Sequence, residues 1–521
     1  MKTQMIMNAV GRMVPKKING IPQTPFMGVG KYKTSGLKAS PPIRNCSEYP
    51  MDGNKVVSSL EEALVMAGIR DRMTISSHHH FRNGDLVMNQ VFDQLYELGI
   101  KNLRWFPSAA FPCHSPIIKH LENGTIDLVE GSLNGDLGRF VSSGKMKKIG
   151  VLRSHGGRWQ AVQDGEVHID IAIVAAPSAD AFGNATGEHG PSACGSLGFA
   201  LVDSIYATQV IVVTDNLVPF PCIPWQIQGQ NVDHVVVMDK IGIPEKIVSG
   251  TTAITLSKER LEIAEMTAKF VKAAGIIKDG FSFQAGAGGI PLAFSKYVRE
   301  IMKNARVKAK FIRGGSTKQL VKMLEEGITE YILDGQTFDL ESVRSLRENH
   351  GHISTSPFTS YNWHGKGNIA SQVDVVVLGA TEVDVNFNAN VVTHSDGLLL
   401  HGIGGWQNCL FSKCTILAIP SVRKKNPIIV DELTTLVGPG ELIDVIVTDR
   451  GIAINPLRKD LLLATENSDL PIRKIKEIKQ DIDIVINLPL EKSVHSNELV
   501  SIVKWVDGTV IDSIFSRPSQ K

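Results

Sequence analysis

The sequence contains only six cysteines in 521 residues, and none of them stands in the close pairs that zinc sites use. No C-x-x-C occurs, and no other short paired spacing indicates a zinc site. Reduced thiols in a cytosolic protein are therefore expected. The six positions are Cys46, Cys113, Cys194, Cys222, Cys409 and Cys414.

The sequence also lacks long hydrophobic runs and an excess of charge of either sign. Its longest apolar runs, such as residues 374–378, have the length of a strand and not of a membrane span. The first residues, MKTQMIMNAVGRMVPKK, contain no continuous apolar segment typical of a secretion signal. The 55 Lys and Arg nearly balance the 53 Asp and Glu, so a net charge of +2 exerts no long-range attraction on nucleic acid or membranes. A cytoplasmic location without either partner is expected.

What the sequence does have is the hydrophobic periodicity of an α/β protein. Residues 1–55 are rich in Pro, Gly, Lys and Asn and predict an extended arm. After the arm, helical spacing alternates with strand-like apolar runs, which predicts a mainly parallel sheet covered by helices. The alternating segments are the helical stretches 58–68 and 85–98 and the strand-like stretches 73–81, 167–177 and 209–215.

The alternation begins again after a basic stretch at residues 299–313, so two α/β domains are predicted, at 56–300 and 301–521. The basic stretch itself predicts a solvated face or, if it is functional, a docking patch. Two segments echo each other: AIVAAPSADAFGNA (172–185) and VVVLGATEVDVNFNAN (375–390) each carry a buried strand, a small-residue turn and an Asp near an Asn. An internal duplication that produces two similar open sheets is expected.

The segment FSFQAGAGGIPLAF (281–294) is the most informative candidate site. A strand leads into Gly286, Gly288 and Gly289, and glycines let backbone amides approach a ligand closely at the start of a helix. A thioester oxyanion or a phosphate would suit this loop. The alternative is a tight turn without a ligand. The spacing is not G-x-G-x-x-G, which disfavours a dinucleotide site.

A second glycine cluster, HGIGGWQN (401–408), follows the central strands of the second half. It predicts an opposing wall of a cleft, in which Gly404 and Gly405 offer backbone amides and Gln407 offers a side-chain amide. The alternative is a compact turn stabilised by the packing of Trp406.

Three consecutive histidines, His78 to His80, suggest a metal site at first sight. Adjacent side chains on a strand point to opposite faces, and no H-x-x-x-H or nearby carboxylate completes a ligand shell, so no metal is predicted. Two other interpretations remain, a solvated strand end and a polar edge in which His79, Arg82 and Asn83 bind a carboxylate. No G-x-S-x-G, P-loop or H-E-x-x-H motif occurs.

In combination and in order, several motifs resemble those of the CoA-transferase superfamily, and more closely those of the citrate lyase alpha chain family. The resemblance extends from about residue 55 to the C terminus. It rests on SHHHFRNGD (77–85), SLNGDLGRF (132–140), SADAFGNATG (178–187), ATGEHGPSACGS (185–196), QAGAGGIPLAF (284–294), LGATEVDVNFNAN (378–390), HGIGGWQN (401–408) and GPGELIDVIVTDRGIAINP (438–456).

This resemblance implies two similar α/β domains with the active site between them, and a citrate:acyl-carrier-protein transferase. The thioester would lie on a dephospho-CoA-derived group of a carrier (gamma) subunit, and a beta subunit would cleave the citryl carrier to oxaloacetate within an oligomeric complex. No cofactor is expected on this chain. The implied residues are Gly286, Gly288, Gly289, Gly404 and Gly405 in catalysis, Ser316 and Thr317 besides His79, Arg82, Asn83 and Gln407 at the substrates, and Ile290, Pro291 and Gly402 near the prosthetic group.

One departure from the superfamily concerns the mechanism. Many relatives carry a glutamate early in the second domain that forms a thioester with CoA, whereas the turn RGGSTKQ (313–319) has none. A mixed anhydride between acetate and citrate is then the simplest route. The alternatives are a CoA-transferase or acyl-CoA hydrolase that acts on free CoA, and a non-catalytic scaffold subunit.

Overall fold

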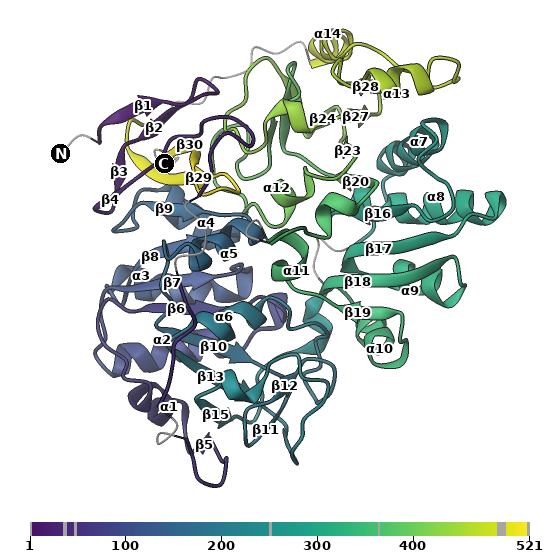
Figure 1. Cartoon of the computed structure of the whole chain (residues 1–521). Coiled ribbons are helices and arrows are strands. Elements are labelled where there is room, and N and C mark those ends of the chain that lie inside the picture. Colours follow the sequence, from purple (N-terminus) through teal and green to yellow (C-terminus); the bar gives the residue numbers. More distant parts are fainter. Residues whose placement is uncertain are drawn as a thin grey trace.

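The computed structural model describes residues 3–34, 39–45, 49–248, 253–362, 365–486 and 496–517. Two large sheets dominate it (Figure 1). The ten-stranded sheet with its helices is called the first half, and the eight-stranded sheet with its helices is called the second half. Five cysteines are free thiols, and Cys46 lies outside the described residues. Within those residues, no helix is both long and apolar enough to cross a membrane.

The first sheet has ten strands. In spatial order these are β30 (Val510–Phe515), β29 (Leu499–Lys504), β9 (Gly150–Leu152), β8 (Ile126–Gly131), β7 (Leu103–Pro107), β6 (Thr74–Ser77), β10 (Ile171–Ala175), β13 (Gln209–Thr214), β15 (His234–Val237) and β5 (Val56–Val57).

The second sheet has eight strands. Their order is β19 (His352–Ser354), β18 (Thr329–Thr337), β17 (Ala309–Ser316), β16 (Ser282–Ala285), β20 (Val375–Leu378), β23 (Thr415–Ala418), β27 (Val445–Thr448) and β28 (Gly451–Ile454).

Seven strands of each sheet follow the same order, and all of their pairings are parallel. The run β9-β8-β7-β6-β10-β13-β15 matches the run β19-β18-β17-β16-β20-β23-β27. The expected internal duplication is therefore confirmed, and β6 in the first half corresponds to β16 in the second.

The duplication extends to single hydrogen bonds in the two echoing segments. Asp180 accepts the side-chain amide of Asn184 at 2.8 Å, and Asp384 accepts that of Asn388 at 2.8 Å. The side-chain oxygen of each asparagine then accepts a distant glycine amide, from Gly229 (2.9 Å) in the first half and Gly440 (2.8 Å) in the second. Each turn lies in a small three-stranded sheet, made of β11 (Ser178–Asp180), β12 (Ala185–Thr186) and β14 (Leu217–Val218) or of β21 (Glu382–Asp384), β22 (Ala389–Asn390) and β26 (Ile429–Val430).

Helices cover the sheets where the apolar spacing predicts them. In α2, Val87, Val91 and Leu95 recur every four residues and are fully buried. The α-helices are α1 (Leu60–Met66), α2 (Val87–Glu97), α3 (Ile118–Glu122), α4 (Gly135–Ser142), α5 (His155–Gln163), α6 (Ala200–Tyr206), α7 (Lys258–Ala273), α8 (Gly289–Ala305), α9 (Lys318–Glu325), α10 (Leu340–Glu348), α11 (Pro357–Tyr361), α12 (Trp406–Cys409), α13 (Lys459–Ala464) and α14 (Ile475–Ile486).

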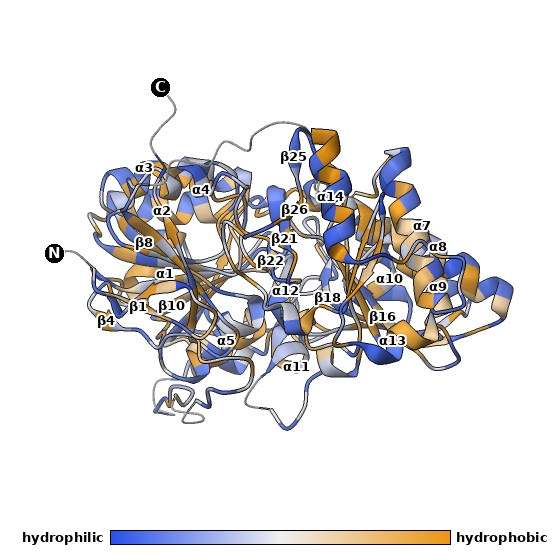
Figure 2. Ribbon diagram, turned by 90° about the horizontal axis from the view of Figure 1, so that it is seen from above, coloured by the Kyte–Doolittle hydropathy of each residue, from blue (hydrophilic) through white to orange (hydrophobic). Residues whose placement is uncertain are grey.

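The two halves share part of one hydrophobic core. On β20, Val376 and Leu378 point into the same cluster as Val174 of β10, whereas Val375 and Val377 point to a second cluster under α7 and α8. Figure 2 shows the hydrophobic residues concentrated on the strands between the outer helices. One face of the second sheet is therefore turned toward the first half, with α11 and α12 in between (Figure 1).

The expected domain boundary differs from the division between the sheets. A boundary between residues 300 and 301 would cut α8, and β16 already belongs to the second sheet because it pairs with both β17 and β20. At the other end, β29 and β30 return to the first sheet and pair with β9. The expectation failed because it assumed that each sheet is built from one continuous stretch of chain.

The N-terminal segment is not simply an extended arm. It forms the strand pairs β1 (Met5–Met7) with β2 (Met13–Pro15) and β3 (Lys17–Ile18) with β4 (Ile21–Pro22). Val14 is fully buried beside Val510, and the ring of Phe26 lies 5.8 Å from that of Trp505. Apolar residues among the glycines and lysines thus fix this segment to the C-terminal strands, as the purple and yellow ribbons in Figure 1 show.

The basic stretch divides into two environments. Arg299 and Lys303 lie on the surface beside Glu326, as a solvated face would. Arg313 does not belong to that face, because it is 1% exposed on β17, where it donates to Gln284 at 2.8 Å.

Candidate active site

The candidate residues gather where the equivalent central strands β6 and β16 end. The histidines follow β6, and the glycine run follows β16. In open parallel sheets, ligands bind beyond the carboxyl ends of the strands. The interface between the two halves, beyond the carboxyl ends of β6 and β16, is therefore the candidate active site.

The three histidines do not lie on a strand, since β6 ends at Ser77, and each ring has a different partner. His78 Nε2 lies 2.8 Å from Asp203, which also binds Arg158. His80 Nε2 lies 2.6 Å from the carbonyl of Ala175, and burial lowers the pKa of His80 to about 4. Although they follow the strand, the rings still alternate: those of His78 and His80 are stacked at 6.4 Å, whereas that of His79 packs against His155 and Phe199.

His79 connects the two halves. Its Nδ1 lies 2.6 Å from Ser108 Oγ, and its Nε2 lies 3.2 Å from Gln336 Oε1 on β18. Because an amide oxygen only accepts, the proton is on Nε2, and Ser108 donates to Nδ1. Burial, followed by the neighbouring His155 ring and the positive charge of Arg82, holds the pKa of His79 well below its ordinary value. Both ring nitrogens are thus occupied, which does not fit direct binding of a carboxylate by this side chain.

Arg82 and Asn83 lie beside His79 at the same interface. The guanidinium of Arg82 is 4.8 Å from the ring of Phe111 in the first half and 5.0 Å from that of Phe338 in the second. Burial lowers the pKa of Arg82 to about 10, so the side chain remains a cation at neutral pH. Asn83 is half-buried, and its Oδ1 has no hydrogen-bond partner among the described residues.

The glycine run after β16 only partly fits the expected oxyanion loop. The amide of Gly286 already donates to the carbonyl of Val377 at 2.8 Å, so it is not free for a ligand, contrary to expectation. Gly288 precedes α8 with φ +139°, a backbone conformation that needs glycine. Its amide and that of Gly289 donate to none of the described residues, and both glycines are half-buried. Ile290 and Pro291 are buried in the first turn of α8.

Of the glycines at 402–405, Gly402 and Gly404 fit against the first half, and Gly405 fits against Tyr361 of the second half. A side chain on Gly402 would collide with Ser132. Gly404, with φ +63°, accepts the backbone amide of His155 at 2.8 Å. A Cβ on Gly405 would stand 2.7 Å from the hydroxyl of Tyr361. The small residues of this loop therefore let the two halves approach each other closely.

Three residues expected at the substrates have other surroundings: Gln407, Ser316 and Thr317. Gln407 is fully buried and donates to the carbonyls of Val437 (2.9 Å) and Lys504 (3.2 Å), so its amide does not face a cleft. Ser316 is buried and donates to Asp334 at 2.7 Å. Thr317 is the residue before α9 and is half-buried.

Sequence reasoning missed His155 and the ion pair of Arg158 with Asp203. Ser154, which accepts the amide of Gly157 at 3.0 Å, is a helix-start signal that predicts α5. No local pattern indicates that α5 begins against Gly404, more than two hundred residues later in the chain.

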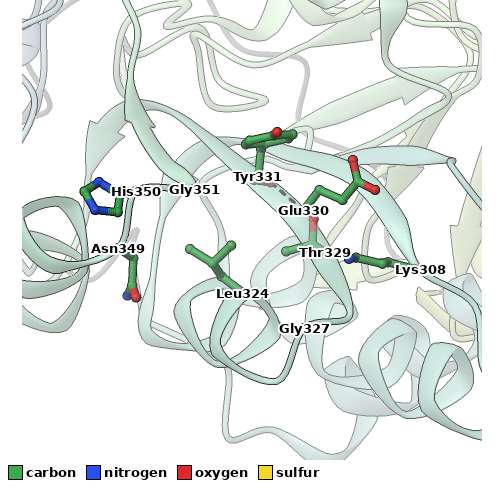
Figure 3. Close-up of a pocket in the computed structure, with 9 residues that line it drawn as sticks. All are labelled: Lys308, Leu324, Gly327, Thr329, Glu330, Tyr331, Asn349, His350 and Gly351. Carbon is green, nitrogen blue, oxygen red and sulfur yellow. Dashed lines mark hydrogen bonds between the residues drawn. The ribbon is translucent and has the colours of Figure 1, made fainter.

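A separate surface hollow of about 580 Å³ lies at the amino ends of strands of the second sheet, opposite to the candidate site (Figure 3). It is formed where β17, β18 and β19 begin, away from their carboxyl ends. It does not contain any of the candidate residues. Its lining consists of Lys308, Leu324, Gly327, Thr329, Glu330, Tyr331, Asn349, His350 and Gly351.

Similarity to known proteins extends over most of the chain. The model of the family described as citrate lyase, alpha subunit (CitF) matches residues 53–516. The chain belongs to the citrate lyase alpha subunit family. The citrate lyase alpha chain of Haemophilus influenzae is 38% identical over 483 residues, 92% of this chain and 96% of the relative. That of Escherichia coli is 37% identical, with 88% and 90% covered.

Solved structures extend the comparison. A Streptococcus mutans structure described as the citrate lyase alpha subunit in complex with citrate has a TM-score of 0.91 and 38% identity, and covers 98% of this chain and all of that one. A 4-hydroxybutyrate CoA-transferase from Porphyromonas gingivalis has a TM-score of 0.53 and 16% identity, with 83% of this chain and 98% of that one covered. The second likeness shows a shared fold alone. Membership in the citrate lyase alpha subunit family makes this chain a transferase component of citrate lyase.

Proposed function

We propose that the chain exchanges acetate for citrate on the thioester of an acyl carrier protein, so that acetyl carrier and citrate become citryl carrier and acetate. The observation that carries this proposal is the family match over residues 53–516. The solved relative described with citrate supports the choice of substrate.

The turn after β17 supports a route without a covalent enzyme thioester. Residues 313–319 contain no carboxylate. Two carboxylates outside the turn accept hydrogen bonds from it. Asp339 accepts the amide of Lys318 at 2.7 Å, and Asp334, which is fully buried, accepts both Ser316 and Thr337 at 2.7 Å. A carboxylate held in this way is a poor nucleophile, since attack on a thioester would break its hydrogen bonds.

The proposed route has two acyl transfers. A citrate carboxylate attacks the acetyl thioester carbonyl, a C–O bond forms, and the carrier leaves as a thiolate, which gives a citric-acetic anhydride. The thiolate then attacks the citryl carbonyl of the anhydride and acetate leaves. Each step passes through a tetrahedral oxyanion, and the protein's contribution is to hold the partners in place and to stabilise that charge.

Two groups of residues serve these steps in our proposal. The amides of Gly288 and Gly289, at the positive end of the 17-residue helix α8, donate to the oxyanion. Arg82 and Asn83 hold a citrate carboxylate that does not react. His79 positions this pair without contacting citrate itself.

The remaining expectations are part of the same proposal. Gly404 and Gly405 close the site from the second half, Ser316, Thr317 and Gln407 support its walls, and Ile290, Pro291 and Gly402 border the prosthetic group of the carrier. A carrier (gamma) subunit and a cleaving (beta) subunit complete the complex in the cytoplasm.

Incubation of the chain with acetylated carrier and citrate tests the proposal. Release of acetate together with a citryl carrier, identified by its mass, is the expected result. A covalent CoA adduct of the chain after incubation with acetyl-CoA would favour a CoA-transferase that acts on free CoA. No exchange by the folded chain would leave the scaffold interpretation.

A further inference from the structure

His155 stands out among the histidines of the interface. It is the first residue of α5 in the first half, and its backbone amide donates to Gly404 of the second half at 2.8 Å. Its ring lies 5.2 Å from that of His79 and 4.6 Å from that of Phe199. The nitrogen Nε2 would be 3.8 Å from a Cβ placed on Gly404. The imidazole therefore borders the glycine loop that closes the candidate site.

Its ring nitrogens differ from those of its neighbours. His78, His79 and His80 are buried, and each uses at least one ring nitrogen in a hydrogen bond within the protein. His155 is half-buried, and its ring nitrogens bond to none of the described residues. A polar ring held by stacking, with no polar partner at an interface, is placed to bond a ligand.

The electrostatic surroundings keep this ring uncharged. Burial, and secondarily the charge of Arg158, lower the pKa of His155 to about 3. Asp203 occupies the guanidinium of Arg158 through two hydrogen bonds, at 2.8 and 2.6 Å. A neutral imidazole has one N–H donor, and it polarises a carbonyl without giving up a proton.

We propose that His155 is a catalytic residue whose ring N–H donates a hydrogen bond to the oxygen that becomes negative in the acyl transfers. The inference rests on the proposed function. No proton changes place in this role, since the bond strengthens as the tetrahedral oxyanion forms and weakens as it collapses. The nitrogen on the side of Gly404, Nε2, is assigned as the donor.

Three variants separate this role from one in packing. The side-chain nitrogen of His155→Gln reproduces the position of Nε2, that of His155→Asn reproduces Nδ1, and His155→Phe keeps only the stacking. The measurement is kcat and the KM for citrate in the exchange on acetylated carrier. The Phe variant is expected to lose about a hundredfold or more in kcat at nearly unchanged KM, and the Gln variant to recover at least a tenth of wild-type kcat.

The opposite ranking would overturn the inference. If packing alone matters, the Phe variant is as active as the wild type, and the Gln and Asn variants have lower midpoints of thermal unfolding. A Gln variant no better than Phe, while both unfold at the wild-type temperature, also counts against a donor at Nε2. An inactive wild-type chain would contradict the proposed function itself, which keeps the two failures distinct.

Discussion

The side chain of Gln336 binds His79 through both atoms of its amide. Its oxygen lies 3.2 Å from His79 Nε2, and its nitrogen donates to the His79 carbonyl at 3.1 Å. Gln336 belongs to the second half and His79 to the first, so this pair fixes the two halves beside the candidate site.

Gln336→Leu is expected to destabilise the protein by about 1–3 kcal/mol, because a buried N–H and a buried carbonyl lose their partners. The measurement is the midpoint of thermal unfolding, with Gln230→Leu on the exposed surface as the control. Exchange activity should fall as well, since the His79 ring loses the bond that fixes its proton on Nε2. A variant as stable and active as the control would show that the pair has no such role.

Gly288→Val is expected to reduce exchange about a hundredfold or more, because a branched side chain blocks approach to the amides at the start of α8. Gly280 is the control: its φ is also positive, at +77°, and nothing lies within 4 Å of its Cβ position. Gly280→Val places the same side chain at a positive φ without touching the site, although with less backbone strain than at φ +139°, so thermal unfolding of both variants is measured beside their activity. Equal activity of the two variants would remove Gly288 from the oxyanion site.

Arg82→Ala is expected to raise the KM for citrate far more than the KM for the carrier, since a group that holds a non-reacting carboxylate is lost. Arg82→Lys should recover only part of the affinity, because an ammonium cannot form two parallel hydrogen bonds to a carboxylate. Arg344→Ala, at an exposed arginine paired with glutamates, is the control. Equal damage to both substrates would indicate a role in packing between Phe111 and Phe338.

The sequence was sufficient to predict the α/β alternation and the duplication, because both depend on local periodicity. In α2 and β10, the apolar spacing alone determines which residues are buried. The return of β29 and β30 to the first sheet could not be predicted. Pairing of Ile502 with Val151 is a contact between distant parts of the chain, and no short pattern encodes it.

The candidate site was predictable to a similar extent. Glycine runs indicate close approach of the backbone, but not what approaches: Gly402 faces Ser132 of the other half, and the Gly286 amide binds Val377. Likewise, Gln407 has a side-chain amide of the kind that often binds ligands, but this amide supports the C-terminal strands by donating to the carbonyl of Lys504. Such assignments depend on tertiary contacts between the two halves.

Asp512 on β30 provides a test of how the C-terminal strands join the second half. Its carboxylate accepts the amide of Leu436 at 2.6 Å, and Arg12 lies 3.8 Å away. Burial raises the pKa of Asp512 to about 6, although Arg12 opposes the shift. The folded protein therefore binds this proton more tightly than the unfolded chain, whose aspartates titrate near pH 4.

The sign of the expected pH dependence follows from that difference. The contribution of Asp512 to stability is complete below about pH 4, and it is lost as the pH rises through 6. Between pH 4.5 and 7.5, the wild type should lose about 2 kcal/mol of unfolding free energy relative to Asp512→Asn, whose amide does not titrate. Thermal unfolding of both proteins at the two pH values measures this, because all other groups contribute equally. If the unfolding free energies of the two proteins change in parallel with pH, Asp512 is already ionised in the folded protein over this range. The effect of Arg12 on its pKa would then be larger than the effect of burial.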